Sequence, residues 1–195
     1  MIDIKGLGHI NIVVDSIEEA SEYYQELFSA KPIQCFPSFK NTGFAKSAGF
    51  IENPNEVEVS INFLQIPSTN IILELMCYHN PPAISLDYNP KPNNLGGVSH
   101  ICLSVKNIFE AFHKVKNIKN TTLINTSDYY QPCKLDVVKP DEFIFFDDAK
   151  ENNQYLKAKS AAVSCEITFF YFYDKYKVLW ELEETPEDIE DPALE

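Results

Sequence analysis

Two histidines and two glutamates occupy matching positions in the two halves of this 195-residue sequence. His9 and His100 each precede an apolar stretch, and Glu74 and Glu181 each interrupt another. Imidazole nitrogen and carboxylate oxygen suit a divalent first-row metal, and two carboxylates balance its 2+ charge. Such a set leaves two adjacent positions of an octahedral ion for water or substrate. A single histidine on a strand is usually structural, but the paired occurrence predicts one metal site with four ligands.

An internal repeat is the evidence that these positions correspond. Residues 9–20 align without a gap with residues 100–111, at an offset of 100 − 9 = 91, and six of the twelve positions are identical. In both copies apolar residues alternate with others, which is typical of a strand with one buried face. A capping box, the signature of a helix start, then follows in each copy. The two boxes are Ser16-x-x-Glu19 and Asn107-x-x-Glu110.

The apolar stretches after each helix predict further strands, at 32–36, 56–65, 71–78, 166–173 and 178–183. The two glutamates are 181 − 74 = 107 positions apart, so the second half carries 107 − 91 = 16 additional residues. We place them in a polar insertion at 117–160, with 141–148 as an added strand, and such insertions often form a lid or one wall of a site. The sequence therefore predicts an α+β fold. Two tandem βαβββ modules would form a curved mixed sheet around a central metal site, with the helices outside.

These patterns divide the chain into four parts. Residues 1–80 form the first module and 96–184 the second. The connector 81–95 is rich in proline, which stiffens a linker and is rare inside sheets. The last part, 185–195, continues an acidic end in which seven of the thirteen residues from Glu183 to Glu195 are Asp or Glu, as expected of a solvated tail.

Charge and composition exclude several classes of partner. The formal net charge is −13, and all sixteen basic residues are lysine, which disfavours nucleic acid. No apolar run approaches the roughly 18–20 residues that span a bilayer, so we expect no membrane partner. The start of the sequence lacks the pattern of a secretory signal, and we expect a cytoplasmic protein. Five scattered cysteines predict reduced thiols, mostly buried or half-buried.

The same segments resemble those of the vicinal oxygen chelate superfamily. This superfamily includes glyoxalase-I type lyases, methylmalonyl-CoA epimerases, extradiol dioxygenases and the fosfomycin and bleomycin resistance proteins. The resemblance spans about Ile4 to Glu184. It is carried by Gly8-His9-Ile10-Asn11-Ile12-Val13-Val14, Ile72-Leu73-Glu74-Leu75, Val98-Ser99-His100-Ile101-Cys102-Leu103 and Tyr171-Phe172-Tyr173-Asp174 with Leu179-Trp180-Glu181-Leu182. Where members commonly have Pro-Asp-Gly-Asn after the aspartate, Lys175-Tyr176-Lys177-Val178 stands here.

The resemblance assigns roles to the four candidate ligands. His9, Glu74, His100 and Glu181 fall on the family's metal positions, and this set is similar to that of bacterial glyoxalase-I type enzymes. It implies one divalent ion (Ni, Co, Mn, Zn or Fe) and a small-molecule substrate that chelates it through two neighbouring oxygens. A carboxylate would move a proton next to a carbonyl, with Glu181 as the first candidate base and Glu74 as the second. By analogy with the family, we also expect a homodimer.

The reaction class stays open between a lyase and an epimerase or isomerase. Glu52 is the only acidic residue between Phe36 and Asn55, where epimerases carry a second acid or base, and no arginine is present for the carboxylates of glutathione. A non-catalytic binding protein of the resistance type and an iron-dependent extradiol dioxygenase are the alternatives.

Strand alternation adds neighbours to the site. Asn11, Met76, Cys102 and Glu183 share faces with the ligands and are candidate pocket residues. Glu183 is an alternative fourth ligand, and Cys102 is either a reactive thiol or, as we prefer, a small core residue. The aromatic run 169–173 is interpreted as a strand buried on both faces, with a stacking wall for a flat substrate as the alternative.

Overall fold

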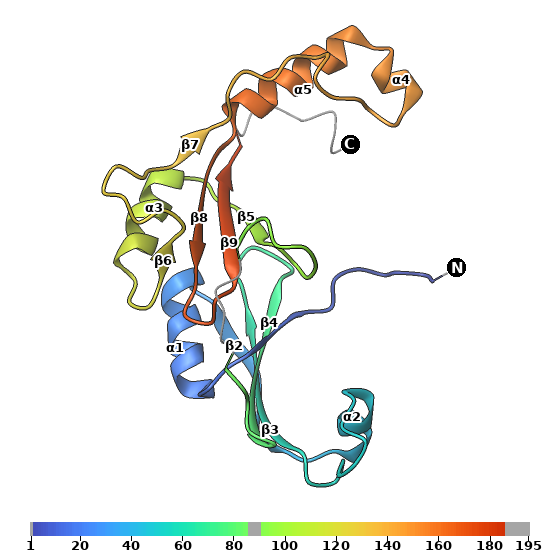
Figure 1. Cartoon of the computed structure of the whole chain (residues 1–195), viewed down its shortest axis with the longest axis vertical. Coiled ribbons are helices and arrows are strands. Elements are labelled where there is room, and N and C mark those ends of the chain that lie inside the picture. Colours follow the sequence, from blue (N-terminus) through green and yellow to red (C-terminus); the bar gives the residue numbers. More distant parts are fainter. Residues whose placement is uncertain (1, 86–90, 186–195) are drawn as a thin grey trace. The chain divides into compact units, whose positions relative to one another are not determined.

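The computed structural model describes residues 2–85 and 91–185. The chain is α+β, as predicted, and it divides into two compact units, Met1–Asn89 and Pro90–Glu195. Each unit has its own mixed sheet (Figure 1). Among the described residues, no helix has the length and apolar character needed to cross a membrane. The middle of the predicted linker, 86–90, and the predicted tail beyond residue 185 lie outside the described residues.

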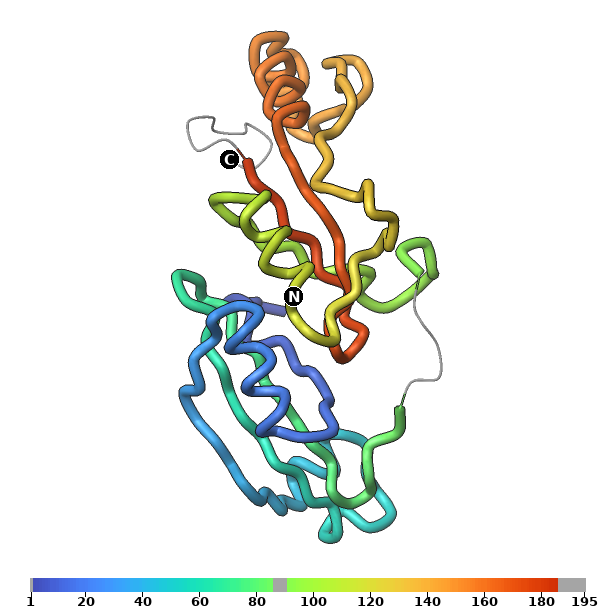
Figure 2. The backbone as a smooth tube through the Cα atoms, turned by 90° about the vertical axis from the view of Figure 1, so that its left-hand side faces the viewer, coloured from blue at the N-terminus to red at the C-terminus, as the bar shows by residue number. Residues whose placement is uncertain are grey.

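The first unit has the predicted βαβββ order with one short helix added. Its elements are β1 (Ile10–Val13), α1 (Ile17–Phe28), β2 (Lys31–Phe39), α2 (Thr42–Ser47), β3 (Glu58–Gln65) and β4 (Ile72–Asn80). The strand order is β1-β4-β3-β2, in which β1 runs parallel to β4 and the other neighbours are antiparallel. The helix α1 lies along one face of this sheet (Figure 2). Its N-cap is Ser16, whose side chain accepts a hydrogen bond from the Glu19 amide, as the capping box predicted.

The register of the first sheet separates its two faces. Glu74 pairs with Asn11 of β1 and with Phe63 of β3, so the three side chains share a face. The neighbours of Glu74 along β4, Leu73 and Leu75, are fully buried and point the other way, toward α1. The helix therefore covers one face and leaves the face with the candidate ligand to other contacts.

The second unit repeats this plan with a shortened edge. Its elements are β5 (Ile101–Ser104), α3 (Ile108–Asn117), β6 (Thr122–Leu123), β7 (Cys133–Lys134), α4 (Asp148–Glu151), α5 (Gln154–Glu166), β8 (Thr168–Tyr173) and β9 (Leu179–Glu184). The strand order is β5-β9-β8-β6, with β5 parallel to β9, and β7 also pairs with β8. Asn107 caps α3 by accepting from the Glu110 amide, again as predicted. Two strands of two residues stand where the first unit has the long β2.

The prediction of an added strand at 141–148 is wrong. The insertion instead contains the helices α4 and α5, and Figure 2 shows α5 continuing directly into β8. Side chains of the following helices bind two backbone groups of the segment before α4, which would otherwise need a strand partner. The Phe145 amide donates to Glu151, and the buried ammonium of Lys157 donates to the Phe143 carbonyl and to Glu151.

The aromatic strand β8 is buried on one face only, so the prediction of burial on both faces is wrong. Phe170 and Phe172 are fully buried, whereas Phe169 and Tyr171 are half-buried. The physical reason is that α3 covers one face of this sheet, where Phe112 packs edge-on against Phe170 with the ring centroids 5.1 Å apart. The opposite face is the one that carries Glu181, since Tyr171 pairs with Glu181 in the register.

The hairpin between β8 and β9 is closed by the buried carboxylate of Asp174. Its Oδ1 accepts hydrogen bonds from the amides of Tyr176 (2.8 Å) and Val178 (2.9 Å), and its Oδ2 accepts from the Trp180 indole (2.8 Å). These bonds fix the turn although its sequence departs from the family pattern. They therefore set where Glu181, the residue after Trp180, lies on β9.

All five cysteines are free thiols, as predicted. Their predicted burial is wrong for three of them, because Cys35, Cys102 and Cys133 are exposed. Cys102 and Cys133 lie on strands of only four and two residues, and Cys35 lies on the edge strand β2. Short and edge strands have little structure packed over their outer faces, which leaves these side chains exposed.

Candidate metal centre

The first unit brings His9 and Glu74 together. His9 immediately precedes β1, and its Nε2 lies 3.0 Å from Oε2 of Glu74 on the parallel strand β4. The side-chain amide of Asn11 donates to the same Oε2 over 2.9 Å. The Glu74 side chain is only 11% exposed and the His9 side chain 46% exposed. The carboxylate is therefore anchored in the sheet while the imidazole is accessible.

The second unit builds the same pair from equivalent elements. His100 immediately precedes β5, and its Nε2 lies 3.0 Å from Oε2 of Glu181 on β9. The exposed fractions of the two side chains, 38% and 12%, follow the pattern of the first pair. The residue equivalent to Asn11 is Cys102, which pairs with Glu181 in the register. The two units thus present the same two atoms at the same separation.

The geometry of each pair fits a shared cation. Two ligand atoms that lie about 2.1 Å from one ion and subtend a right angle are about 3.0 Å apart. The Nε2–Oε2 separation in both pairs has this value, which is also that of a direct hydrogen bond. The donor set of neutral imidazole and hard carboxylate suits a divalent first-row metal. Each pair, His9 with Glu74 and His100 with Glu181, therefore has the donor atoms and the separation that two ligands of one divalent ion require.

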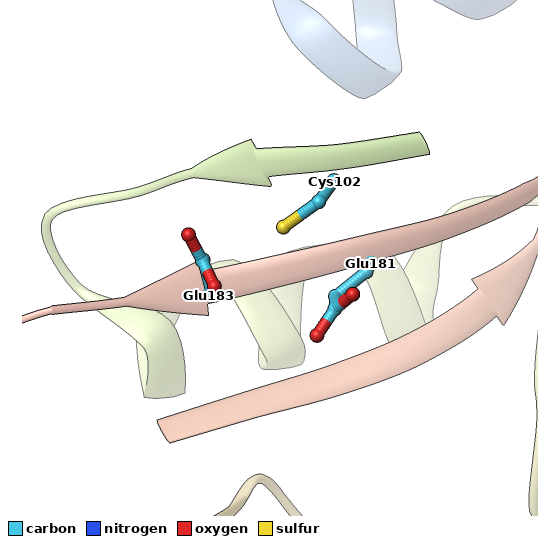
Figure 3. A group of neighbouring side chains, drawn as sticks. All are labelled: Cys102, Glu181 and Glu183. Atoms are coloured by element: carbon cyan, nitrogen blue, oxygen red, sulfur yellow. The ribbon is translucent and has the colours of Figure 1, made fainter. Parts of the chain in front are cut away.

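A further cluster adjoins the second pair. Cys102 of β5 and Glu181 and Glu183 of β9 place one ligand atom each within 4.8 Å of one another (Figure 3). Loss of solvent around the sulfur, then the charges of both glutamates, raises the pKa of the Cys102 thiol to about 12. Burial, followed by its hydrogen bond with Glu181 and the charge of that residue, also raises the pKa of Tyr171. Burial is the largest cause of both shifts, and the nearby glutamate charges add a negative potential that attracts a cation.

Each histidine packs against an aromatic ring; Tyr171 belongs to the aromatic run 169–173 that the sequence offered as an alternative stacking wall, whereas the sequence reasoning did not assign Phe63 to the site. The rings of His9 and Phe63 are 6.1 Å apart, and those of His100 and Tyr171 are 5.4 Å apart, both edge-on. Phe63 and Tyr171 are the antiparallel partners of Glu74 and Glu181. The repeat did contain a signal for them, since both lie on predicted strands next to the strand that carries the glutamate.

The comparison with protein families decides the membership of the chain. The model of the Glyoxalase/Bleomycin resistance protein/Dioxygenase superfamily matches residues 6–131. The chain belongs to this superfamily. The match covers the first unit, β5, α3 and β6, and thus includes His9, Glu74 and His100. No functionally curated protein matches the sequence.

Solved structures with the superfamily fold extend the likeness over nearly the whole chain. A glyoxalase family protein from Bacillus cereus has a TM-score of 0.63 at 15% identity, and the match covers 94% of this chain and 96% of the other. The fosfomycin resistance protein FosX from Listeria monocytogenes, solved with Mn(II) and sulfate, has a TM-score of 0.51 at 15% identity, with 95% and 94% covered. A mutant of the same FosX, solved with Mn(II) and 1S,2S-dihydroxypropylphosphonic acid, has a TM-score of 0.50 at 16% identity, with 95% and 96% covered.

The predicted pocket residues of this superfamily member differ in their surroundings. Asn11 contacts Glu74 directly. Met76 lies on the same face of the sheet as Glu74, where it is buried in an apolar cluster with Val59 and Ile61. Cys102 is exposed beside Glu181, so the interpretation of a small core residue is wrong, and its raised pKa argues against a reactive thiolate. Glu183 accepts a hydrogen bond from the Ser104 hydroxyl over 3.2 Å, while Glu181 is the partner of His100.

Proposed function

We propose that this chain is a metal-dependent enzyme of the lyase or isomerase/epimerase type. In this proposal His9, Glu74, His100 and Glu181 hold one divalent ion, and the substrate chelates it through two neighbouring oxygens. One observation carries the proposal. Each unit independently places the Nε2 of a histidine and the Oε2 of a glutamate 3.0 Å apart at repeat-equivalent positions. The recurrence of the same two atoms at the same separation supports the assignment of both pairs to metal binding.

The proposal gives the four residues two roles, binding of the metal ion and transfer of a proton. The two imidazoles would donate neutral Nε2 lone pairs, and Glu74, held by the Asn11 amide, would serve as the fixed carboxylate ligand. When bound, the ion supplies Lewis-acid polarisation of a carbonyl oxygen. Glu181 is the base in this proposal, as the resemblance to the glyoxalase-I type pattern implies, with Glu74 as the second candidate. Where Glu74 has the Asn11 amide beside it, Glu181 has the Cys102 thiol, a weaker hydrogen-bond donor, and the Tyr171 phenol, which is hydrogen-bonded to it.

The known structures support a metal of this kind in the superfamily. FosX, similar in fold to this chain, was solved with Mn(II). The candidate ions for this donor set, namely Ni, Co, Mn, Zn or Fe, therefore include an ion that a protein of this fold binds. A small-molecule substrate, a homodimer and a cytoplasmic location complete the proposal as predictions.

The test is the metal content of gently purified protein, measured by plasma mass spectrometry for the parent chain and three variants. We expect about one divalent ion per chain in the parent, and its loss in His100→Ala and Glu181→Ala. The matched control is His113→Ala, which removes an exposed histidine of α3 in the same unit and should keep the ion. A parent chain that neither contains a metal nor takes one up on reconstitution would refute the proposal and favour a binding protein.

The identity of the ion then separates the enzyme classes. Iron together with oxygen consumption on addition of catechols would place the chain with the extradiol dioxygenases and overturn the proton-transfer chemistry. Manganese, cobalt, nickel or zinc, with exchange of a carbon-bound proton next to a carbonyl into heavy water, would support it. Glu181→Gln keeps the size of the side chain and removes the base, so it should abolish that exchange more completely than it reduces metal content.

A further inference from the structure

We infer that the substrate is an uncharged molecule whose chelating oxygens carry an aromatic or similarly flat apolar group. The inference rests on the proposed function and adds the substrate class. It follows from two aromatic surfaces, one in each unit, and from the charges around them. The first-unit aromatic surface consists of Phe36, Phe39 and Phe63, and the second-unit aromatic surface consists of Phe169 and Tyr171.

The first-unit aromatic surface begins at a candidate ligand. The ring of Phe63 lies 6.1 Å from that of His9, Phe36 lies 6.5 Å from Phe63, and Phe39 lies 5.5 Å from Phe36, all edge-on. Phe36 pairs with Ile61 of β3, which places it on the Glu74 face. The three phenylalanines are half-buried and pack on a buried apolar cluster that includes Ile61. A contiguous apolar surface therefore extends away from the first ligand pair.

The second-unit aromatic surface repeats the arrangement at the other pair. The ring of Tyr171 lies 5.4 Å from that of His100, and the ring of Phe169 lies 5.8 Å from that of Tyr171, again edge-on. Both residues alternate with the buried Phe170 and so share the face of Glu181. Each candidate ligand pair is thus bordered by half-buried rings of its own unit. Half-buried aromatic rings favour contact with a flat apolar group.

The charges around the ligands disfavour an anionic substrate. The sequence contains no arginine, the residue best suited to hold a carboxylate, phosphate or phosphonate through two hydrogen bonds. Beside the second pair, Glu183 adds a carboxylate within 4.8 Å of the ligand atoms of Cys102 and Glu181. FosX was solved with a phosphonic acid, and this chain lacks the guanidinium groups that suit such a group. The neighbouring rings and the surplus of negative charge point to a neutral, apolar substrate body.

The experiment measures binding of three hydroxamic acids to Mn(II)-loaded protein by calorimetry, since a hydroxamate chelates through two neighbouring oxygens. Benzohydroxamic acid should bind about tenfold or more tightly than acetohydroxamic acid, because its ring buries additional apolar surface. 4-Carboxybenzohydroxamic acid, which adds a negative charge to the ring, should bind more weakly than benzohydroxamic acid. Metal-free protein should bind none of the three appreciably.

Variants assign the preference to the aromatic surface. Phe36→Ala should reduce the preference for benzohydroxamic over acetohydroxamic acid at least threefold and leave acetohydroxamic acid unchanged. Phe28→Ala is the matched control, since it removes a half-buried ring of α1, the helix on the opposite side of the same sheet. If Phe36→Ala does not fold, as judged by circular dichroism, Phe36→Leu should show the same change with a smaller amplitude.

The outcomes separate this inference from the proposed function. Metal-dependent binding of all three acids with equal affinity, or tightest binding of the carboxylated probe, would overturn the substrate class and leave the metal-dependent function standing. Equal binding with and without Mn(II), or binding of none of the acids by the loaded protein, would overturn both. Loss of the preference in Phe28→Ala as well as Phe36→Ala would also refute the assignment to the first-unit aromatic surface.

Discussion

Replacing Asn11 by alanine is expected to weaken binding of a divalent metal about ten- to a hundredfold. The Asn11 amide donates to Oε2 of Glu74 over 2.9 Å, and this oxygen is also the one nearest Nε2 of His9. A partner of this kind fixes the rotamer of the carboxylate and favours its ionised form. Loss of such a partner typically lowers the affinity for the metal about ten- to a hundredfold. The factor corresponds to about 1.4–2.7 kcal/mol, which matches the value of one hydrogen bond to a charged group.

The assay is calorimetric titration of metal-free protein with Mn(II), for the parent chain, Asn11→Ala and a control. Ser38→Ala is the control, because the Ser38 hydroxyl also donates to a carboxylate, Oε1 of Glu58, over 2.9 Å in the same unit. That carboxylate pairs with Lys40 rather than with a histidine. The control should leave the affinity for Mn(II) unchanged. Urea unfolding of the metal-free proteins shows whether either change affects folding.

Two results would refute the reasoning. An affinity of Asn11→Ala within about twofold of the parent would mean that Glu74 does not need its amide partner to bind the ion, or is not a ligand. An equal loss in Ser38→Ala would mean that the decrease reflects general destabilisation of the first unit. Asn11→Asp offers an internal check, because replacing the donor by a second carboxylate that repels Glu74 alters the site more than alanine does.

Three further predictions concern the scaffold and the thiol. Asp174→Ala should lower the free energy of unfolding by about 2–4 kcal/mol, because it leaves the Trp180 indole and two amides of the hairpin without their acceptor. The measurement is a urea titration, and a loss of less than about 1 kcal/mol would contradict the prediction. Ser16→Ala and Asn107→Ala each remove a helix cap, and each should lower the free energy of unfolding by about 1 kcal/mol. An unchanged midpoint of the urea titration would show that the caps do not contribute to stability. In metal-free protein at pH 8, Cys102 should react with iodoacetamide about a thousandfold more slowly than a free cysteine peptide, because raising the pKa from 9.0 to about 12 removes thiolate at that pH. Its reactivity should rise as the pH approaches 12, and equal labelling rates in peptide mapping would refute the shift.

The internal repeat in the sequence predicted several elements of the fold. Alternation of apolar residues after His9 and His100 identified β1 and β5, and the capping boxes identified the starts of α1 and α3. These signals are local, since a strand face has a period of two residues and a helix start has a fixed spacing of polar groups. The likeness of Ile72-Leu73-Glu74-Leu75 to Leu179-Trp180-Glu181-Leu182 then gave the position of the closing strands, β4 and β9, that carry the two glutamates.

The insertion shows where local pattern was insufficient. The stretch 141–148 contains aromatic residues that suit a strand, but a strand forms only if a neighbour supplies hydrogen bonds. Here Glu151 and the buried Lys157, from the helices that follow, bind the Phe145 amide and the Phe143 carbonyl in place of a neighbouring strand. The prediction that β8 is buried on both faces was wrong for a different reason. Its sequence is aromatic at nearly every position, and only the placement of α3 decides which face is buried.

By itself, the sequence determined which residues are paired by the repeat and on which face of its strand each candidate ligand lies. Tertiary structure decided which side chains meet across strands. The parallel pairing of β1 with β4 sets His9 against Glu74, and the antiparallel registers put Phe63 and Tyr171 beside the two histidines. The physical reason is that periodicity is a property of one segment, whereas the register between strands depends on hydrogen bonds and packing among residues far apart in the chain.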